Sequence, residues 1–400
     1  MFANCPNLAA DRWSCTAAKI NRRLADATVL IRAFDDHSAG FVNSPPAGGS
    51  TVLFRNSSEM LDGGSEFSYG THGSPIVRDL SLALTLLEKA AASVLTCSGL
   101  AALTLVFMCC LRLGDRALVI DSVYEPLREF CNGPLAAQGV ATDYFDPKDE
   151  TCFKRLLRST TRLVHLESPA SGTLEMVQVD KICEHVKARS SKCVVSMDNS
   201  WATPLAFKPL TYGVDVSVNA LTKYPCGGSD VVMGSVSANA KVMLKLVKYH
   251  SWFGMCVGDQ ESYVVLKGLK TAKARLSFHY VAAVKVASFL ETVASVDEVF
   301  YPAVPSSPYY ELWKLSYKLA GGVLSFSLLG DCDKAKRFLN KLKVFGLGWS
   351  WGGYKSLASI VDVSGRCYPP PGGRTIIRLQ LGMEEIDDLI WDLNQAFKAL

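Results

Sequence analysis

The sequence predicts an α/β protein: a mostly parallel sheet covered by helices, a smaller α+β C-terminal domain and an extended N-terminal arm. Three observations predict this arrangement. Between about residues 80 and 235, short apolar strand-type segments alternate with helix-like stretches, a pattern typical of a parallel sheet covered on both faces. The C-terminal part mixes helices and strands. The first 70 residues are rich in Pro, Gly, Ser and Asn, which is typical of extended chain.

Length and composition agree with this fold class. The chain has 400 residues, too many for one small core, so a large domain and a smaller one are expected. The formal net charge is only +4, and no dense run of Lys and Arg occurs. Nucleic acid is therefore not an expected partner.

The elements follow in order along the chain. The arm includes the Pro- and Gly-rich stretch 43–49. Strands of the parallel sheet are expected at 116–121, 162–167, 192–198, 214–219 and 230–236. A long helix is expected over 264–293, followed by strands at 322–329 and 374–381. The predicted divisions are an arm over 1–72, a large domain over 73–268 and a small domain over 269–400.

One segment has a second interpretation. Residues 94–111 are uncharged and mostly apolar, and they reach the length of a membrane span. The alternative is a short strand, a turn at Ser98–Gly99 and a buried helix. We favour the buried helix, because nothing else in the chain resembles a span and α/β proteins bury such helices. No membrane association is therefore expected.

The cysteines and histidines give no sign of a metal site. The thirteen cysteines are scattered and form no C-x-x-C pair, which is typical of reduced thiols in a cytoplasmic protein. The N-terminus has no apolar run of signal-peptide length. Cys226 is a candidate reactive thiol if it is exposed, whereas Cys97 is interpreted as a packed small side chain. Structural roles are expected for the histidines in strand-like or helical stretches, His165, His185, His250 and His279.

Polar groups follow the predicted strands at the points where each strand ends. Asp198 ends one strand, and Lys223 follows the next one. Ligands of open α/β sheets bind at this edge. An Asp and a Lys placed there match pyridoxal 5′-phosphate, since the acid keeps the ring nitrogen protonated and the amine forms the imine. The spacing alone fits a surface ion pair equally well.

Two further features favour the cofactor. Ser98, Gly99 and Leu100 lie in a small-residue turn that joins a strand to a helix, and backbone N–H groups at such a helix start bind phosphate. A simple structural turn fits this segment nearly as well. Tyr124 follows a third strand, where its ring would lie over a planar cofactor. Without the neighbouring features, an ordinary half-buried tyrosine would be the better interpretation.

At these residues the sequence resembles the Cys/Met-metabolism family of pyridoxal-phosphate enzymes. The string Asp198-Asn-Ser-Trp-Ala-Thr-Pro, then Lys223-Tyr224 and the following Gly-Gly-Ser-Asp, carry the resemblance. It begins near residue 40 and ends at Arg378-Leu-Gln-Leu-Gly-Met-Glu-Glu-Ile-Asp-Asp-Leu. The family includes cystathionine β-lyase, cystathionine γ-synthase, cystathionine γ-lyase and methionine γ-lyase. The resemblance implies an aspartate-aminotransferase-like fold, fold type I, with the cofactor in the 73–268 domain.

The resemblance also implies a role for each matching residue. Lys223 would be the Schiff-base lysine and proton shuttle. Asp198 would pair with the ring nitrogen, and Tyr124 would stack on the ring. The phosphate would be held by Ser98, Gly99, Leu100 and Thr222. Arg378 would clamp the substrate α-carboxylate.

The arm would take part in catalysis across a subunit boundary. Tyr69 would reach into the site of the neighbouring subunit. The resemblance therefore implies a homo-oligomer, with a dimer as the minimum active unit and a homotetramer of two dimers expected.

Several positions favour cystathionine β-lyase over the γ-enzymes. Trp351, next to Ser350 in a Ser-Trp-Gly-Gly-Tyr motif, stands where γ-enzymes usually have Leu. Ser171 stands where those enzymes commonly place Asn. The residues around Phe130 and Tyr144 also resemble the bacterial β-lyases. The implied reaction is the β-elimination of L-cystathionine, an amino-acid thioether, to homocysteine, pyruvate and ammonia in methionine biosynthesis.

Some positions depart from the family pattern. Thr71 replaces a phosphate-binding Arg, so cofactor binding would be weaker unless His72 or another cation substitutes. Ala220, Gly227 and Lys355 replace Ser, His and Glu. The alternatives are a γ-lyase or γ-synthase, or a non-catalytic regulatory protein that binds the cofactor.

Overall fold

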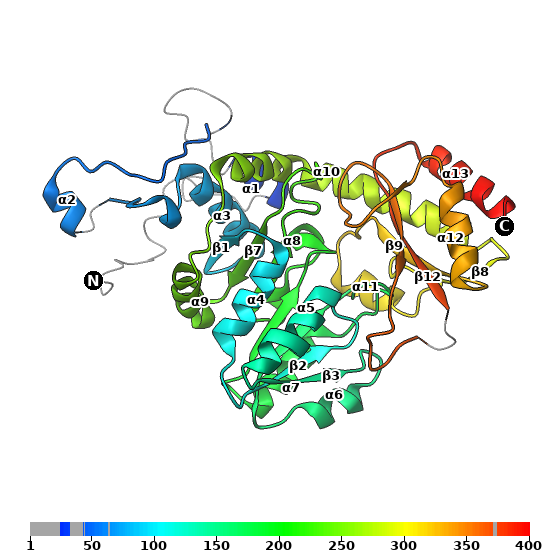
Figure 1. Ribbon diagram of the computed structural model, residues 1–400, viewed down its shortest axis with the longest axis horizontal. Coiled ribbons are helices and arrows are strands. Elements are labelled where there is room, and N and C mark those ends of the chain that lie inside the picture. The colour runs from blue at the N-terminus through cyan, green and yellow to red at the C-terminus, as the bar shows by residue number, and fades with distance from the viewer. Residues whose placement is uncertain (1–24, 33–42, 44, 63–64, 371–373) are drawn as a thin grey trace.

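The molecule is built on two sheets (Figure 1). The computed structural model describes residues 25–32, 43, 45–62, 65–370 and 374–400. The first sheet has seven strands in the order β1-β7-β6-β5-β4-β2-β3, and the second has five in the order β10-β11-β12-β9-β8. The predicted α/β arrangement is confirmed.

The first sheet is parallel except for β7. Its strands are β1 (Ala92–Thr96), β2 (Arg116–Ile120), β3 (Ala141–Phe145), β4 (Thr161–Glu167), β5 (Val194–Asp198), β6 (Val216–Ala220) and β7 (Gly234–Ala238). β7 pairs antiparallel with both β1 and β6. The strand expected at 230–236 begins later than predicted, because Met233 pairs with Thr222 at 3.0–3.2 Å instead of joining the ladder.

Helices cover this sheet (Figure 1), and its central strands are largely buried, whereas the edge strand β3 is mostly half-buried. The covering helices are α3 (Pro75–Glu88), α4 (Gly99–Cys110), α5 (Glu125–Phe130), α6 (Glu150–Leu156), α7 (Val179–Arg189), α8 (Thr203–Ala206) and α9 (Ala240–Trp252). α4 is the helix of the apolar segment 94–111. It has 12 residues and contacts β6 and β7, so the buried-helix interpretation is confirmed. Within the described ranges, no helix combines the length and the apolar character needed to cross a membrane.

One long helix connects the two sheets. α10 (Asp259–Leu290) has 32 residues and contacts α3 beside the first sheet and β9 in the second. It begins and ends slightly earlier than the predicted helix over 264–293. The predicted division between residues 268 and 269 falls inside this continuous helix, and the three predicted domain ranges stay predictions.

The second sheet carries helices beside it and matches the predicted α+β character (Figure 1). Its strands are β8 (Val296–Phe300), β9 (Val323–Leu328), β10 (Gly346–Leu347), β11 (Leu357–Val361) and β12 (Thr375–Gln380). Its helices are α11 (Tyr310–Ser316), α12 (Cys332–Lys341) and α13 (Ile386–Lys398). β12 pairs antiparallel with β9 and β11, which fixes the position of Arg378.

The described part of the N-terminal arm has little regular structure. It contains α1 (Asp26–Arg32), α2 (Ser57–Asp62) and the short helix η3 (Gly70–His72). α2 projects from the body of the molecule at the left of Figure 1. Most of the predicted arm, residues 1–24 and 33–42 included, lies outside the described residues.

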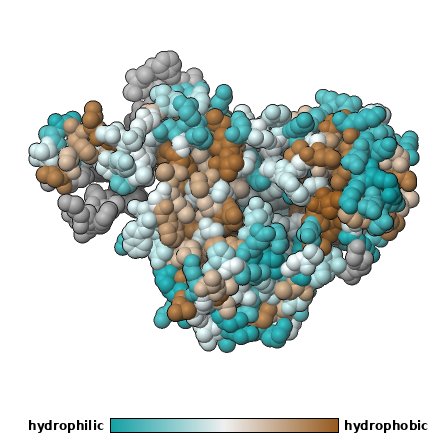
Figure 2. Space-filling view, viewed as in Figure 1, coloured by the Kyte–Doolittle hydropathy of each residue, from teal (hydrophilic) through white to brown (hydrophobic). Residues whose placement is uncertain are grey.

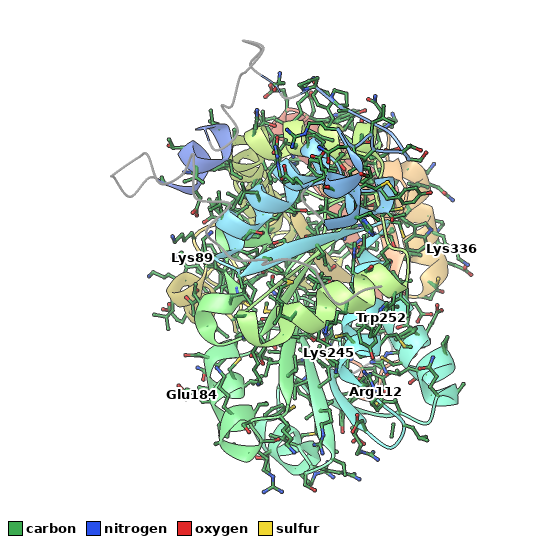
Figure 3. All side chains as sticks on the ribbon, turned by 90° about the vertical axis from the view of Figure 1, so that its left-hand side faces the viewer. Lys89, Arg112, Glu184, Lys245, Trp252 and Lys336 are labelled. Carbon is green, nitrogen blue, oxygen red and sulfur yellow. The ribbon has the colours of Figure 1, made fainter. Side chains whose placement is uncertain are left out.

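Apolar side chains are exposed on more than one face. Figure 2 shows hydrophobic surface in the middle of the molecule, over the first sheet, and again over the second sheet. On the side shown in Figure 3, Trp252 faces the viewer, together with the charged side chains of Arg112 and Lys245. Leu244 and Trp252, both on α9, are more than half exposed.

Candidate active site

Lys223 lies just beyond the end of β6, with its amine held among groups from the second sheet. Its Nζ donates a hydrogen bond to Ser350 Oγ at 2.7 Å and lies 4.9 Å from the centre of the Trp351 ring. Burial and the positive charge of Arg378 lower the pKa of the amine to about 8, and Asp198 partly opposes this shift. A neutral amine, the form that attacks a carbonyl carbon, is therefore accessible near neutral pH.

The segment Ser350–Gly352 passes directly over the backbone of Lys223. Ser350 and Gly352 have φ values of 78° and 86°. A Cβ on Gly352 would lie 2.7 Å from Tyr224 N and 2.8 Å from the carbonyl carbon of Lys223. Only glycine fits this position. The close crossing places Ser350 and Trp351 against the lysine.

Arg378 projects from β12 towards the same place. Its guanidinium donates to the Ser350 carbonyl at 3.4 Å. Burial lowers its pKa, and the nearby Tyr124 acts in the opposite direction. Arg378 nevertheless stays charged at any physiological pH, so a cation faces the lysine across the segment.

Asp198 ends β5 as a half-buried carboxylate. Its Oδ1 accepts a hydrogen bond from Ser200 N at 2.9 Å, and Ser200 is its one hydrogen-bond donor in the described part of the chain. Burial raises the pKa of Asp198, and the Lys223 charge acts against that rise. Ser200 Oγ also accepts from Ala220 N at 2.7 Å, which ties the strand carrying Asp198 to the turn carrying Lys223.

The start of α4 lies beside that turn. Ser98 caps the helix by accepting from Ala101 N at 3.0 Å. The N–H groups of the first turn have no partner within a helix, so those of Gly99 and Leu100 suit an anion. A Cβ on Gly99 would lie 2.8 Å from the Cβ of Ala220. The predicted phosphate site and the lysine turn are therefore neighbours.

Tyr124 precedes α5 and is 42% exposed. Its backbone N–H donates to Glu167 Oε2 at 2.8 Å. Burial, Asp198 and Glu167, in that order, raise the pKa of its phenol. Tyr124 therefore lies close enough to Asp198 and Arg378 for their charges to act on its phenol, and its role at the cofactor ring stays a prediction.

Tyr69 stands apart from these residues. It is 51% exposed and pairs through its backbone with Thr51. Among the described residues, no hydrogen bond or ring contact joins it to the rest of the predicted site within this chain. His72, the candidate replacement for the missing Arg, is exposed and its Nδ1 lies 2.8 Å from Ser68 Oγ.

Comparison with known proteins identifies the family. Residues 27–398 match the model of the Cys/Met metabolism PLP-dependent enzymes. The chain belongs to this family. A putative cystathionine β-lyase of Rhizobium johnstonii is 42% identical over 96% of each chain. An L-alanine/L-glutamate racemase of Wolbachia pipientis is 34% identical over 94% of this chain and 98% of its own.

A solved structure of the same family matches the fold. Cystathionine γ-synthase from Xanthomonas oryzae pv. oryzae superposes with a TM-score of 0.88 at 27% identity, covering 94% of this chain and 99% of its own. The fold is therefore the type I fold of pyridoxal-phosphate enzymes, and pyridoxal 5′-phosphate is the cofactor.

The residues of this family member fit that cofactor. Asp198 is a half-buried carboxylate with a single hydrogen-bond donor among the described residues, which suits a protonated ring nitrogen, and Lys223 is an amine with a lowered pKa. The unpaired N–H groups at the start of α4 suit the phosphate. Thr222 has its hydroxyl within 3.2 Å of the backbone of Met233.

Sequence reasoning assigned no role to one residue of the site. Glu167 ends β4 directly beside Asp198 in the ladder, and it accepts hydrogen bonds from Tyr124 N and Ser171 Oγ. The signal was present, because Glu167 is the last residue of a predicted strand.

The predictions for the histidines and cysteines have mixed outcomes. Cys97 is exposed, so its interpretation as a packed small side chain is wrong. Each of the four histidines with an expected structural role has a hydrogen-bond partner, namely Ser196 Oγ for His165, Lys181 O for His185, Leu95 O for His250 and Leu381 O for His279. The cysteines in the described ranges are all free thiols. Cys226 is buried, and burial raises its pKa, so the condition for its reactivity is not met.

Proposed function

We propose that the protein is a carbon–sulfur lyase that cleaves L-cystathionine by β-elimination. The products would be homocysteine, pyruvate and ammonia. The observation that carries the proposal is the Lys223 amine, with its lowered pKa, held against Ser350 and the Trp351 ring and facing Arg378. The 42% identity to a putative cystathionine β-lyase supports it.

Each site residue has a defined task in this reaction. Bound pyridoxal phosphate withdraws electrons from the substrate Cα. Asp198 would hold the ring nitrogen protonated, Tyr124 would stack on the ring, and the phosphate would be held by Ser98, Gly99, Leu100 and Thr222. These roles follow the family resemblance, and the strand-end geometry supports them.

Lys223 moves the protons. As a free amine it takes the proton from Cα. The Cβ–S bond then breaks, the sulfur leaves with the electron pair, and the Lys223 ammonium returns a proton to it as homocysteine departs. Water hydrolyses the remaining three-carbon unit to pyruvate and ammonia. Arg378 binds the substrate carboxylate throughout.

Trp351 supports β- over γ-elimination. Its ring lies 5.4 Å from that of Tyr224 and 4.9 Å from Lys223 Nζ. A fixed indole there occupies space that the distal part of a substrate needs when bonds at Cγ react. Ser171 near Glu167 points in the same direction, since γ-enzymes commonly carry Asn there.

Amino-acid racemisation is the second candidate. The relative named as an L-alanine/L-glutamate racemase matches nearly the whole chain. Both reactions begin with removal of the Cα proton, and a racemase returns that proton to the opposite face. Lys223 therefore serves the first step of either reaction. Racemisation also needs a second acid that protonates Cα from the opposite face, and β-elimination needs a leaving group at Cβ.

Product analysis separates the candidates. The purified holoenzyme is incubated with L-cystathionine and, separately, with L-alanine, and Lys223→Ala is run beside it. We expect pyruvate and homocysteine from cystathionine and no turnover by the variant. D-Alanine without keto acid would favour the racemase, and 2-oxobutyrate with cysteine would assign a γ-lyase. Full activity of Lys223→Ala would contradict the proposed role of the lysine.

The proposed active unit is a homo-oligomer in the cytoplasm, at least a dimer and by family resemblance a homotetramer. Exposed Leu53, Leu61 and Tyr69 on the arm support a second copy as the partner, because no other described segment covers them. Free cysteines support the proposed location.

A further inference from the structure

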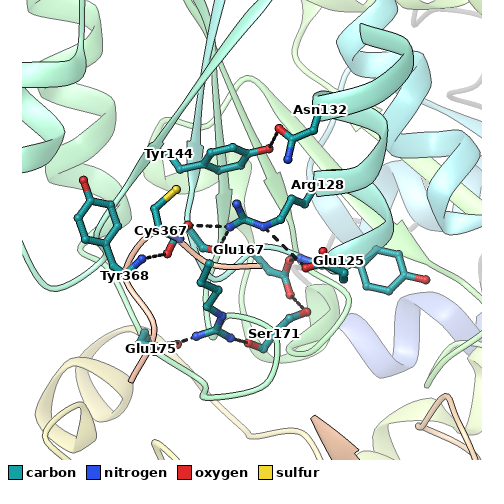
Figure 4. A network of polar contacts seen from close by, with 12 residues as sticks. Glu125, Arg128, Asn132, Tyr144, Glu167, Ser171, Glu175, Cys367 and Tyr368 are labelled. Atoms are coloured by element: carbon teal, nitrogen blue, oxygen red, sulfur yellow. Dashed lines mark hydrogen bonds and ion pairs between the residues drawn. The ribbon is translucent and has the colours of Figure 1, made fainter. Parts of the chain in front are cut away.

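Glu167 joins residues from three parts of the site. It is 9% exposed at the end of β4. Its Oε2 accepts from Tyr124 N at 2.8 Å, and its Oε1 accepts from Ser171 Oγ. It is also the ladder neighbour of Asp198. Figure 4 shows Glu167 and Ser171 within one polar network.

The backbone anchor matters because the Tyr124 side chain has no other anchor. In the described part of the chain, no hydrogen bond to the Tyr124 phenol is formed. The ring position is therefore set by the backbone of Tyr124, where the peptide N–H is bonded to Glu167. Burial and then the neighbouring Asp198 raise the pKa of Glu167. The surroundings of Glu167 therefore disfavour a negative charge on its carboxyl group.

A loop of the second sheet contacts the segment that carries Ser171. Arg366, which lies between β11 and β12, donates to the Ser171 carbonyl at 2.6 Å and to Thr173 Oγ1 at 2.7 Å. A Cβ on Gly172 would lie 3.0 Å from the Arg366 guanidinium. The close packing holds Ser171 within reach of Glu167. Figure 4 shows Ser171 and Glu175 at this end of the network.

We propose that Glu167 is a positioning residue that fixes Tyr124 over the cofactor ring and Ser171 at its edge, with Arg366 keeping Ser171 in place. This inference rests on the proposed function, in which the ring of the cofactor lies against Tyr124. It deepens the site assignment and is independent of which substrate is cleaved.

Cofactor binding tests the proposal without any substrate. The dissociation constant for pyridoxal phosphate and the absorption maximum of the bound cofactor are measured for Glu167→Ala and Glu167→Gln. We expect Glu167→Ala to shift the absorption and weaken binding about tenfold, the loss typical when a buried N–H loses its acceptor. Glu167→Gln keeps an oxygen for Tyr124 N and an amide that donates to Ser171 Oγ, so it restores most of the binding.

Glu88→Gln is the matched control. Glu88 is also a buried carboxylate, bonded to Ser217 and Asn219 at 2.7 Å, and it contacts no proposed site residue. It is expected to change the melting temperature and leave the cofactor spectrum unchanged. A folded Glu167→Ala with wild-type spectrum and affinity would overturn the proposal. If Glu167→Ala does not fold, the cofactor spectrum of Arg366→Lys is measured in its place. An unchanged spectrum in that variant would also overturn the proposal. Because no substrate is used, a failure of the lyase assignment would leave this result intact.

Discussion

At the scale of single residues, the environment of Lys223 sets the chemistry. A lysine at the protein surface is almost fully protonated at neutral pH. Burial and Arg378 favour the neutral form of Lys223, and Asp198 limits the shift. The same Asp198 would pair with the cofactor ring, so one carboxylate influences both the nucleophile and the ring.

The lowered pKa predicts how imine formation depends on pH. Only the neutral amine attacks the cofactor aldehyde. Its fraction rises with pH, reaches about one half near pH 8 and levels off about one pH unit higher. Cofactor-free protein mixed with pyridoxal phosphate should therefore form the imine about tenfold more slowly for each unit by which the pH is lowered well below 8. Stopped-flow absorbance measures this rate. A rate that keeps rising until the pH reaches 10.5, the ordinary pKa of lysine, would contradict a lowered pKa for Lys223.

Trp351 gives a prediction on specificity. Trp351→Leu removes the indole beside Lys223 Nζ and makes room for the distal part of the substrate. We expect the ratio of 2-oxobutyrate to pyruvate from L-cystathionine to rise, as measured by chromatography of the keto acids. Trp349→Leu is the control, because Trp349 is 77% exposed only two residues away. Equal product ratios in wild type and Trp351→Leu would count against a role in specificity.

At the scale of elements, the strand ends could be predicted and the loop crossing could not. Apolar strands and the polar residues that follow them mark the ends of β5 and β6, so Asp198 and Lys223 were found from the sequence. The segment at Ser350–Gly352 was found only through the family motif. Its approach to the Lys223 backbone depends on a tertiary contact between residues about 127 apart, which local pattern cannot show.

That crossing predicts a large effect for one glycine. Gly352→Ala would place a Cβ 2.7 Å from Tyr224 N and also strain a residue at φ 86°. We expect the free energy of unfolding to fall by about 3 kcal/mol or more, with loss of activity.

Gly114→Ala is the matched control for this substitution. Gly114 has the same φ of 86°, but a Cβ there meets no atom within 4 Å. Only the backbone strain remains, so the expected loss is about 1–2 kcal/mol. Denaturant unfolding measures both values. Equal losses for the two variants would show that the crossing is not tight.

At the scale of the whole molecule, the second sheet lies against the candidate site at the first sheet, and the arm is proposed to contribute Tyr69 from a second copy. The second sheet supplies Arg378 and the segment above Lys223 within one chain. The role proposed for Tyr69 cannot be derived from the structure of one chain, because the residues that it would contact belong to a second copy. The exposure of Tyr69 here is compatible with that assignment.

A mixing experiment tests whether Tyr69 acts across the subunit boundary. Tyr69→Phe and Lys223→Ala are each expected to be inactive or severely impaired. When they are unfolded and refolded together, a hybrid dimer contains one site with both native residues. We expect recovery of roughly a quarter of the wild-type activity at equal mixing. Activity no higher than that of the separate variants would place Tyr69 in its own subunit's site or outside any site.

The central claim is that Lys223 is the amine that carries the cofactor, and covalent trapping tests it most directly. The holoenzyme is treated with borohydride, which reduces the imine to a stable secondary amine, and is then digested for peptide mass spectrometry. The account predicts the pyridoxyl-phosphate mass on the peptide that contains Lys223 and its absence from Lys223→Ala. The label on any other lysine would contradict the assignment of the site.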